Sequence, residues 1–490
     1  MAIGMKVMLR AWLYRFARDH RANVAVIFAL MMIPIIFLLG MTLDFTQALR
    51  KKEQLDAAAD AAAIAAVRPA MLMQSDTVAA ATANAIFMST ANALAPGLQN
   101  GAPTPTITVT DTGLSRTVSV SYTSAALNNF PKVLGNGVSK VAWPISGSAT
   151  SQAAAAPNIN WYFLTDDSPS MGIGATLTDI NNLITYTAPS KQPAAASQNC
   201  GFACHEANIA HEGGTQDNLA IAKANNVTLR IDLLKNALTQ LFVSYTGCPQ
   251  TSITTGVMNC MSALNNTTYK AALYTFDVSL NTLATLTTPT LAGNQIGNIS
   301  LMQVQYQNCI YVGCSSTSTS NPNTDFGTDI AGALSTLNSS LPSPGLGSNA
   351  SGDTPQEVVF IITDGVEDKI VANAGACPNA SLASHNRCQQ PLDTTMCTTI
   401  RNRGIKIAVL YTEYLQLKNL GSSQNITDNW YMSWVDTYDE PAPDTGTIAA
   451  KLQACASPGF YKSVATGGDI TKALTDLFIK VASSTASLTQ

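Results

Sequence analysis

The sequence predicts an α/β protein whose doubly wound, mostly parallel sheet carries long, disulfide-bearing insertions and follows a transmembrane helix and a small β-rich unit. Short apolar runs alternate with helical stripes after Asn158, which is typical of such a sheet. An apolar stretch of membrane-spanning length stands near the N-terminus. All ten cysteines lie between Cys200 and Cys455. The 490 residues are enough for two or three domains.

The N-terminus predicts a single membrane anchor. Residues 1–21 form a basic flank, and residues 22–43 are almost uninterruptedly apolar over about the 20 residues that a spanning helix needs. The positive-inside tendency keeps the flank cytoplasmic and places the chain after Asp44 outside. A cleaved signal peptide is the alternative, but the stretch exceeds a signal core and no A-x-A-like site precedes Arg50. The basic residues of the flank are Lys6, Arg10, Arg15, Arg18 and Arg21.

Residues 44–75 predict an alanine-rich helical extension of this span, because residues 43–67 contain good helix formers and no Gly or Pro. The AADAAA element of this stretch follows a segment that carries Asp44, Arg50 and Leu55. Residues 22–67 resemble the N-terminal segment of TadG-type proteins of the tight-adherence (Flp) pilus assembly system.

Residues 76–150 predict a small β-rich unit. Apolar residues alternate with Ser and Thr between Thr104 and Ser146, as half-buried strands require. Residues 148–157 are rich in Ser, Ala and Gln and predict a linker. The alternating apolar residues are Ile107, Val109, Val118, Val120 and Tyr122.

Residues 158–485 predict the doubly wound domain. Four apolar runs have the length of buried strands and mostly end in polar residues, as at the carboxyl edge of a parallel sheet. Amphipathic stripes predict one helix from Leu229 to Phe242 and another from Ile470 to Val481. The four strand candidates are residues 159–164, 271–276, 358–362 and 405–411.

Four stretches, around residues 175–226, 247–269, 286–325 and 367–397, exceed ordinary βα connections and predict insertions. Every cysteine except Cys455 lies inside them. An even cysteine count confined to one region is typical of an oxidising compartment, so we expect disulfides to hold these insertions. Their pairing stays open, and loops that act as lids would look the same.

A candidate metal site follows the first predicted strand. Asp166, Ser168 and Ser170 stand at alternate positions, which can turn three oxygens towards one point above the sheet edge. Such oxygens suit a hard cation, with Mg²⁺ as the first expectation and Mn²⁺ or Ca²⁺ as alternatives. The string alone is weak because Ser and Asp are ordinary turn residues. Thr328, which opens an apolar helix, and Asp364, which ends a strand, should reach the same edge and strengthen the prediction.

The order Asp-x-Ser-x-Ser, Gly-Thr-Asp and Thr-Asp-Gly resembles the metal-ion-dependent adhesion site (MIDAS) of von Willebrand factor A (vWA) domains. The resemblance implies that Asp166, Ser168, Ser170 and Thr328 bind the metal and that Asp364 acts directly or through water. It also implies that an acidic residue of a partner completes the metal shell, which is binding without turnover. A purely structural metal, or a site that holds none, is the alternative.

The neighbouring acidic residues fit other roles. Asp167 lies at the variable position of the motif and should point away from the metal. No His closely follows the three loops, so the site lacks an evident general base and we expect no enzymatic activity. Helix capping or solvation is expected of Asp325, Asp329, Glu367 and Asp368.

A second candidate site is the string Cys200, Cys204 and His205, which differs by one residue from the C-x-x-C-H pattern of covalent haem attachment. A local disulfide is the preferred interpretation, with zinc or haem as alternatives. The further ligands to consider are Met258 or Met261 for haem and His211 for zinc.

Together these features predict a single-pass protein of a bacterial inner membrane with the bulk of its chain in the periplasm. The TadG resemblance implies that its metal-binding domain contacts protein components of pilus assembly. An adhesin at the cell surface or on a pilus is one alternative, and a redox protein built on Cys200, Cys204 and His205 is another. Only 12% of residues are charged and the net charge is −4, so no nucleic-acid partner is expected. No small-molecule substrate is expected either.

Overall fold

The computed structural model shows two compact units, residues 1–154 and residues 155–490. It describes residues 22–68, 71, 74–111, 115–130, 142–188, 199–203, 205–207, 209, 216–248, 255–304, 327–371, 387–414, 416–418, 420, 427–428, 431–439, 446–465 and 467–487.

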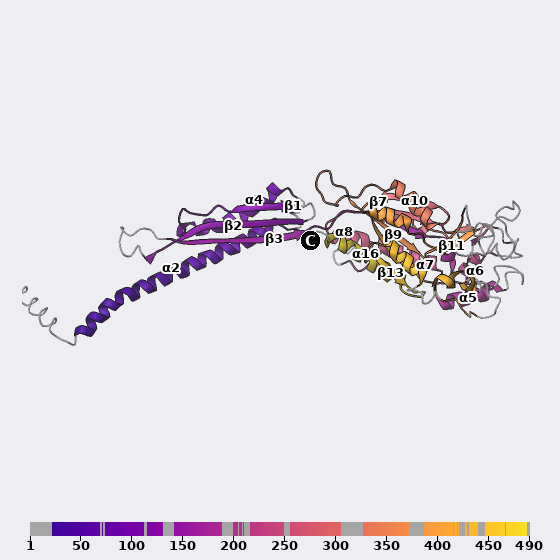
Figure 1. Cartoon of the computed structure of the whole chain (residues 1–490), viewed down its shortest axis with the longest axis horizontal. Helices are drawn as coiled ribbons and strands as arrows, with labels where there is room; N and C mark the ends of the chain where they lie inside the picture. Colours follow the sequence, from indigo (N-terminus) through magenta and orange to yellow (C-terminus); the bar gives the residue numbers. More distant parts are fainter. Residues whose placement is uncertain are drawn as a thin grey trace, which may run out of the picture. The chain divides into compact units, whose positions relative to one another are not determined.

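In the first unit, one long helix runs along a three-stranded antiparallel sheet of order β1-β2-β3 (Figure 1). This helix, α2 (Ala22–Ala66), joins the apolar span and its alanine-rich extension without a break, although Pro34 lies inside it. The helix predicted for residues 43–67 is therefore confirmed up to Ala66. The other elements are α4 (Asp76–Leu94), η1 (Ala95–Gly97), β1 (Thr106–Asp111), β2 (Ser115–Leu127) and β3 (Ala142–Ala154).

The alanines of α2 form the core of the first unit. Ala59, Ala62 and Ala63 are fully buried, and they share one apolar cluster with Phe87 of α4 and Val120 of β2. A methyl side chain lets the helix backbone approach the sheet closely. The apolar alternation predicted for β2 is confirmed, since every second residue from Arg116 to Tyr122 is buried.

Two features of this unit differ from the prediction. Residues 148–154 are not a linker, because they form the second half of β3 and pair with residues 115–121 of β2. β3 is an edge strand whose residues are mostly exposed or half-buried, so its small polar residues give no apolar signal. Residues 76–94 are helical, and α4 buries Ala79, Ala83 and Phe87 on one face.

The second unit is built on a six-stranded sheet of order β13-β12-β9-β4-β6-β7. Every neighbouring pair is parallel except β6 and β7, which confirms the α/β fold with a mostly parallel sheet. The four predicted strands are confirmed as β4 (Ile159–Asp166), β6 (Tyr269–Phe276), β9 (Gln356–Thr363) and β12 (Lys406–Thr412). The edge strands are β7 (Leu280–Thr287) and β13 (Tyr461–Val464).

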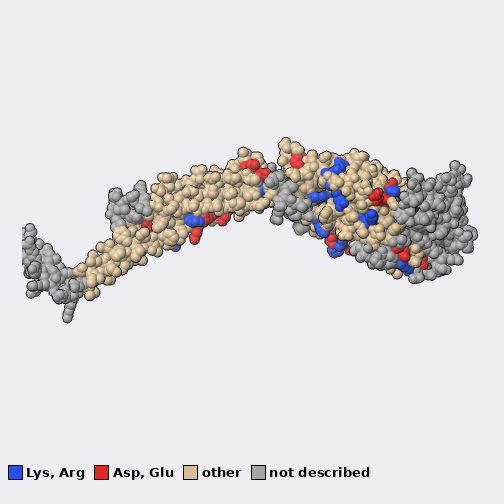
Figure 2. Space-filling model, viewed as in Figure 1, with Lys and Arg blue, Asp and Glu red and all other residues tan. Residues whose placement is uncertain are grey.

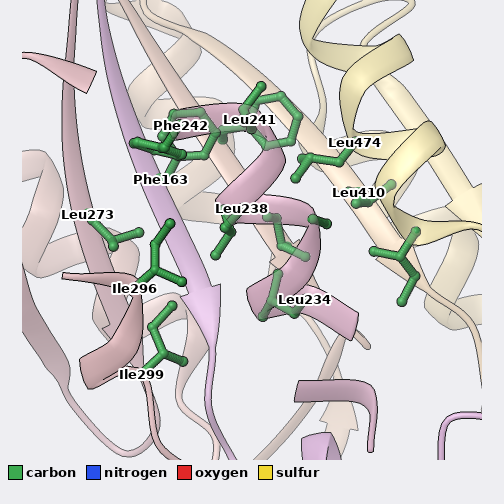
Figure 3. Close-up of a cluster of buried hydrophobic side chains, with 14 of the residues drawn as sticks. Phe163, Leu234, Leu238, Leu241, Phe242, Leu273, Ile296, Ile299, Leu410 and Leu474 are labelled. Carbon is green, nitrogen blue, oxygen red and sulfur yellow. The ribbon is translucent and has the colours of Figure 1, made fainter. Parts of the chain in front are cut away.

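Helices cover both faces of this sheet, and two of them are the predicted amphipathic helices. On one face, α7 (Arg230–Phe242) and α16 (Ile470–Ser487) pack on the strands, where Leu238 and Leu474 lie in the same cluster as Phe163 (Figure 3). The other face carries α10 (Ile330–Ser340), α12 (Thr395–Asn402) and α15 (Thr447–Cys455). Because both faces of β4 are covered, all of its residues are buried.

Two disulfides lie in the described part of the second unit. Cys248 bonds to Cys260 inside the insertion around residues 247–269, as expected. Cys397 bonds to Cys455, which stands 58 residues later, and this bond joins α12 to α15. Cys204, Cys309, Cys314 and Cys377 lie outside the described residues.

The insertions also contain short elements of their own. These are α5 (Leu177–Thr187), β5 (His205–Glu206), α6 (Asn218–Ala224), α8 (Val257–Leu264), α9 (Pro289–Gly293), η6 (Ile296–Asn298), β8 (Gln303–Val304), β10 (Val366–Ile370) and β11 (Arg387–Pro391). The remaining elements are η3 (Pro169–Gly172), η8 (Tyr431–Val435) and α14 (Asp436–Asp439).

Candidate metal centre

The candidate centre lies at the carboxyl edge of the sheet, beside its central strand. β4 ends at Asp166, and its neighbour β9 ends at Thr363, immediately before Asp364. The chain passes from β4 to β6 on one side and only later returns to β9 on the other side. In a doubly wound sheet, the loops diverge at such a point and leave room for a ligand.

Asp166 is fully buried and held by hydrogen bonds to both carboxylate oxygens. The Ser168 N–H donates to Asp166 Oδ1 at 3.0 Å, and the Thr363 hydroxyl donates to Asp166 Oδ2 at 2.6 Å. Thr363 is itself fixed, because its Oγ1 accepts the Gly365 N–H at 3.0 Å. The hydroxyl oxygens of Ser168 and Ser170 lie 3.1 Å apart. The motif therefore presents one carboxylate and two hydroxyls close together.

Asp364 provides a second buried carboxylate at the same edge. It is fully buried. A cationic group nearby is Nη1 of Arg230, 3.8 Å from Oδ2. Arg230 is 2% exposed, donates from Nη2 to the Glu413 carbonyl at 2.7 Å, and stacks over the Tyr414 ring at 4.8 Å.

The electrostatics favour a cation at this point. Burial, and then the negative charge of Asp364, raise the pKa of Asp166 to about 8 against hydrogen bonds that lower it. Burial also raises the pKa of Asp364, although the Arg230 charge and the hydroxyls of Ser170 and Tyr414 oppose this. Two carboxylates and two hydroxyls match the oxygen ligands of Mg²⁺, so the residues fit a hard divalent ion.

The loop that carries Thr328 reaches the same edge. Thr328 and Asp368 form an antiparallel bridge, and the Asp329 N–H donates to the carbonyl of Asp277, just after β6, at 2.8 Å. Gly327 lies directly against the Asp-x-Ser-x-Ser loop, because a Cβ added to it would meet Pro169 Cδ at 2.4 Å. Thr328 itself is 4% exposed. The structure thus brings the predicted segments together.

Two of the neighbouring acidic residues cap the start of α10, which is one of the roles expected of them. Asp329 is the N-cap of α10 and accepts the Gly332 N–H at 3.0 Å. Glu367 accepts the Ala331 N–H at 2.9 Å and pairs with Lys369 at 3.2 Å. Asp167 is buried, and its pKa is raised to about 7, first by burial and also by the charge of Asp277, against a hydrogen bond from Thr275. Asp325 lies outside the described residues.

Three residues at the centre were missed by sequence reasoning. Thr363 orients Asp166, and its position in the Thr-Asp-Gly string could have indicated this role. Arg230 and Tyr414 lie beside Asp364, yet they come from the start of α7 and from the residues after β12. No local motif marks them, because only the tertiary fold brings them to the site.

The Cys200 string is only partly described. Cys200 is buried, and His205 Nδ1 lies 3.1 Å from Asp217 Oδ2. Cys204 and His211 lie outside the described residues. In the described part of the chain, no three side chains of His, Cys, Asp or Glu converge as metal ligands. The Asp166 centre has only two carboxylates, and its other candidate metal ligands are hydroxyls.

The fold and centre define an α/β protein with a carboxylate and hydroxyl cluster at the sheet edge, preceded by an apolar helix. Residues 22–81 match the family model described as putative Flp pilus-assembly TadE/G-like. The TadG-type resemblance of the N-terminal segment is thereby confirmed. No curated protein matches the chain.

Solved structures similar to this chain include vWA domains and pilus proteins. The vWF domain of the type V pili tip protein Mfa5 from Porphyromonas gingivalis is 8% identical, over 68% of this chain and 97% of that one, with a TM-score of 0.28. The PilB minor pilin from Streptococcus sanguinis is 12% identical, over 78% of each chain, with a TM-score of 0.30. Proximal thread matrix protein 1 from the mussel byssus, with a zinc-occupied MIDAS motif, is 12% identical, over 67% and 48%, with a TM-score of 0.27.

Proposed function

We propose that this chain is a membrane-anchored component of a Tad (Flp) pilus-assembly system whose vWA-like domain binds protein partners through a divalent metal. The TadE/G-like match over residues 22–81 supports the pilus-assembly role. The observation that carries the metal site is the pair of fully buried carboxylates, Asp166 and Asp364, beside the hydroxyls of Ser168 and Ser170.

Asp166, Ser168, Ser170 and Thr328 would hold the metal, with Asp364 acting directly or through water. A bound divalent ion supplies two positive charges to a site whose own residues carry two carboxylates and one guanidinium. Mg²⁺ is the first candidate because it prefers oxygen ligands and keeps several waters. An acidic side chain of a partner protein would complete the shell of such a metal, which is binding without turnover.

The anchor is the first half of α2. Two described helices have the length and composition to cross a membrane, residues 24–66 and residues 76–97. The second of these buries Ala79, Ala83, Phe87 and Ala91 in its own unit, so we assign it to the core. We propose an inner-membrane location with the basic flank in the cytoplasm and the rest of the chain in the periplasm. The two disulfides support export, because they persist in oxidising compartments.

Metal binding is tested on purified protein by titration calorimetry with Mg²⁺ and Mn²⁺. Asp166→Asn keeps the shape of the side chain and removes its charge, so we expect it to weaken binding by at least about tenfold. Asp476→Asn makes the same change at a surface ion pair with Lys472 and should leave binding unchanged. Equal metal affinity in the wild type and in Asp166→Asn would contradict the site.

Partner binding is tested by affinity capture of pilus-assembly proteins from membranes of the native bacterium. We expect magnesium removal and Asp166→Asn to lose the same captured proteins, while Asp476→Asn retains them. A set of captured proteins that survives both chelation and Asp166→Asn would show that partners do not bind through the metal.

A further inference from the structure

Residues 24–39 of α2 are exposed in the described structure, but other residues of the unit contact the helix before its apolar stretch ends. The large apolar side chains from Val24 to Leu39 are mostly 40–73% exposed. Figure 1 shows this half of the helix extending past the sheet, and Figure 2 shows its visible face without charged side chains. Gly40 is the first buried residue of the helix, and the exposed apolar residues Met41 and Leu43 still follow it.

The residue that covers Gly40 is Phe130, three residues after β2 ends at Leu127. A Cβ added to Gly40 would lie 2.3 Å from the Phe130 ring, so only glycine permits this approach. The same ring meets Phe37 edge-on, with centroids 5.7 Å apart. Phe130 therefore reaches along α2 by about one turn on the N-terminal side of Gly40.

Asn129 and Phe130 donate hydrogen bonds to two polar side chains of the helix. The backbone N–H groups of Asn129 and Phe130 donate to the two oxygens of Asp44, both at 3.0 Å. The Asn129 amide also donates to Gln47 Oε1 at 2.9 Å. Asp44 is only 6% exposed. A carboxylate and two backbone amides that pair in this way can lie at the edge of a bilayer at low cost, since unsatisfied polar groups are what hydrocarbon excludes.

The length of the apolar stretch of α2 indicates which of its residues lie at the far edge of the hydrocarbon. Val24 to Leu43 is about 20 residues, or about 30 Å of helix, which matches the hydrocarbon thickness. Arg18, Asp19, His20 and Arg21 precede it and oppose an earlier start. If the hydrocarbon ended on the N-terminal side of the Phe130 contact, only residues 22–36 would lie in it. These residues make about 22 Å of helix, which is too short to cross the hydrocarbon. The contact therefore lies inside the hydrocarbon, with Asp44 at its edge.

We propose that Phe130 and the end of β2 insert into the bilayer beside α2, so that the three-stranded unit is embedded in the membrane surface. Phe45, the residue after Asp44 in α2, meets Trp143 edge-on with ring centroids 5.5 Å apart. Aromatic side chains of this kind are enriched in the headgroup layer. The inserted partner is the lipid bilayer, and this inference rests on the proposed membrane anchor.

Depth-dependent tryptophan quenching tests this insertion on the full chain in vesicles of phosphatidylethanolamine and phosphatidylglycerol. Bromine atoms are placed either near the lipid headgroup or deep in the acyl chain. Trp12→Phe removes the tryptophan of the basic flank. The difference in quenched fluorescence between Trp12→Phe and Trp12→Phe/Trp143→Phe is then the contribution of Trp143. We expect shallow bromine to quench Trp143 at least twice as strongly as deep bromine.

Phe130→Trp in the Trp12→Phe/Trp143→Phe background reports the inserted ring itself, and acyl-chain bromine should quench it. Thr110→Trp is the matched control, because Thr110 is exposed and lies about ten residues along the sheet from the β2 end. Neither bromolipid should quench it. If bromolipids quench neither Trp143 nor Phe130→Trp while the protein still floats with alkali-washed vesicles, the insertion is wrong and the anchor stands. If the protein no longer floats, both are wrong.

Discussion

At the residue scale, the hydroxyl of Thr363 decides how Asp166 is presented. It donates to Asp166 Oδ2 at 2.6 Å while its oxygen accepts the Gly365 N–H, so the carboxylate is fixed before any metal binds. Groups that orient metal ligands commonly contribute about 10- to 100-fold in metal affinity. We predict that Thr363→Val, which keeps the shape and removes the hydroxyl, weakens Mg²⁺ binding by about tenfold in calorimetry.

Thr165 provides the matched control for this change. It is also fully buried, and its hydroxyl donates to the Tyr274 carbonyl at 2.8 Å rather than to Asp166. Thr165→Val should therefore lower the free energy of unfolding without changing the metal affinity. If both variants bound Mg²⁺ like the wild type, Thr363 would have no role in presenting the ligand.

Arg230 sets the charge of the centre when no metal is bound. Its Nη1 lies 3.8 Å from Asp364 Oδ2, and both side chains are at most 3% exposed. Removing one partner of a buried ion pair typically costs about 3–5 kcal/mol, because the remaining charge loses its counter-ion. A divalent metal can replace that counter-ion. We predict that Arg230→Met is strongly destabilised in chelator and that Mg²⁺ restores more stability to it than to the wild type.

The measurement is denaturant unfolding with Mg²⁺ or with chelator. Arg116→Met is the control, since Arg116 is also 2% exposed and pairs with Asp111 and Asp76 in the other unit. Its loss of stability should not respond to Mg²⁺. If Mg²⁺ raised the free energy of unfolding of Arg230→Met by no more than that of the wild type, Arg230 would not be coupled to the metal site.

At the scale of elements, the centre depends on how closely two loops approach. A Cβ on Gly327 would lie 2.4 Å from Pro169 Cδ and 3.2 Å from the Met302 sulfur. Ligands must be held within about 0.5 Å of the productive geometry, so a forced shift of either loop separates Thr328 from Ser168 and Ser170. We predict that Gly327→Ala weakens Mg²⁺ binding by about tenfold with little change in the fold.

Gly297 offers the same substitution without the steric conflict. No atom lies within 4 Å of the Cβ position at Gly297, so Gly297→Ala should bind Mg²⁺ like the wild type. Titration calorimetry on both variants, with circular dichroism as a check of the fold, distinguishes them. Equal affinity in Gly327→Ala would mean that the Thr328 loop is not part of the metal shell.

The sequence could predict those elements whose signal is local. β4 and β9 are buried on both faces and appear as apolar runs, interrupted in β4 only by Asn160, and α7 and α16 carry clear apolar stripes. β3 was missed in its second half because an edge strand of small polar residues resembles a linker. The three motif strings were found because each stands directly after a strand or before a helix. Arg230 was not found, since its contact with Asp364 exists only in the folded chain.

At the scale of the whole molecule, the two buried carboxylates should couple folding to pH and to metal. The pKa of Asp166 is raised from 3.8 to about 8, and the pKa of Asp364 is also raised. The metal-free folded state therefore keeps protons that the unfolded chain releases above about pH 4. Its free energy of unfolding should fall as the pH rises from about 4 to about 8.

A divalent cation changes this pH dependence because its positive charge, in place of the bound protons, neutralises both carboxylates. A ligand that binds only the folded state at 100 times its dissociation constant adds about 2.7 kcal/mol. We predict that the stabilisation by Mg²⁺, measured as the difference in denaturant midpoint between Mg²⁺ and chelator, is small near pH 5 and grows towards pH 8. Asp166→Asn cannot bind or release this proton and should show a much weaker growth. Parallel pH curves with and without Mg²⁺ in the wild type would mean that proton and metal do not compete for Asp166.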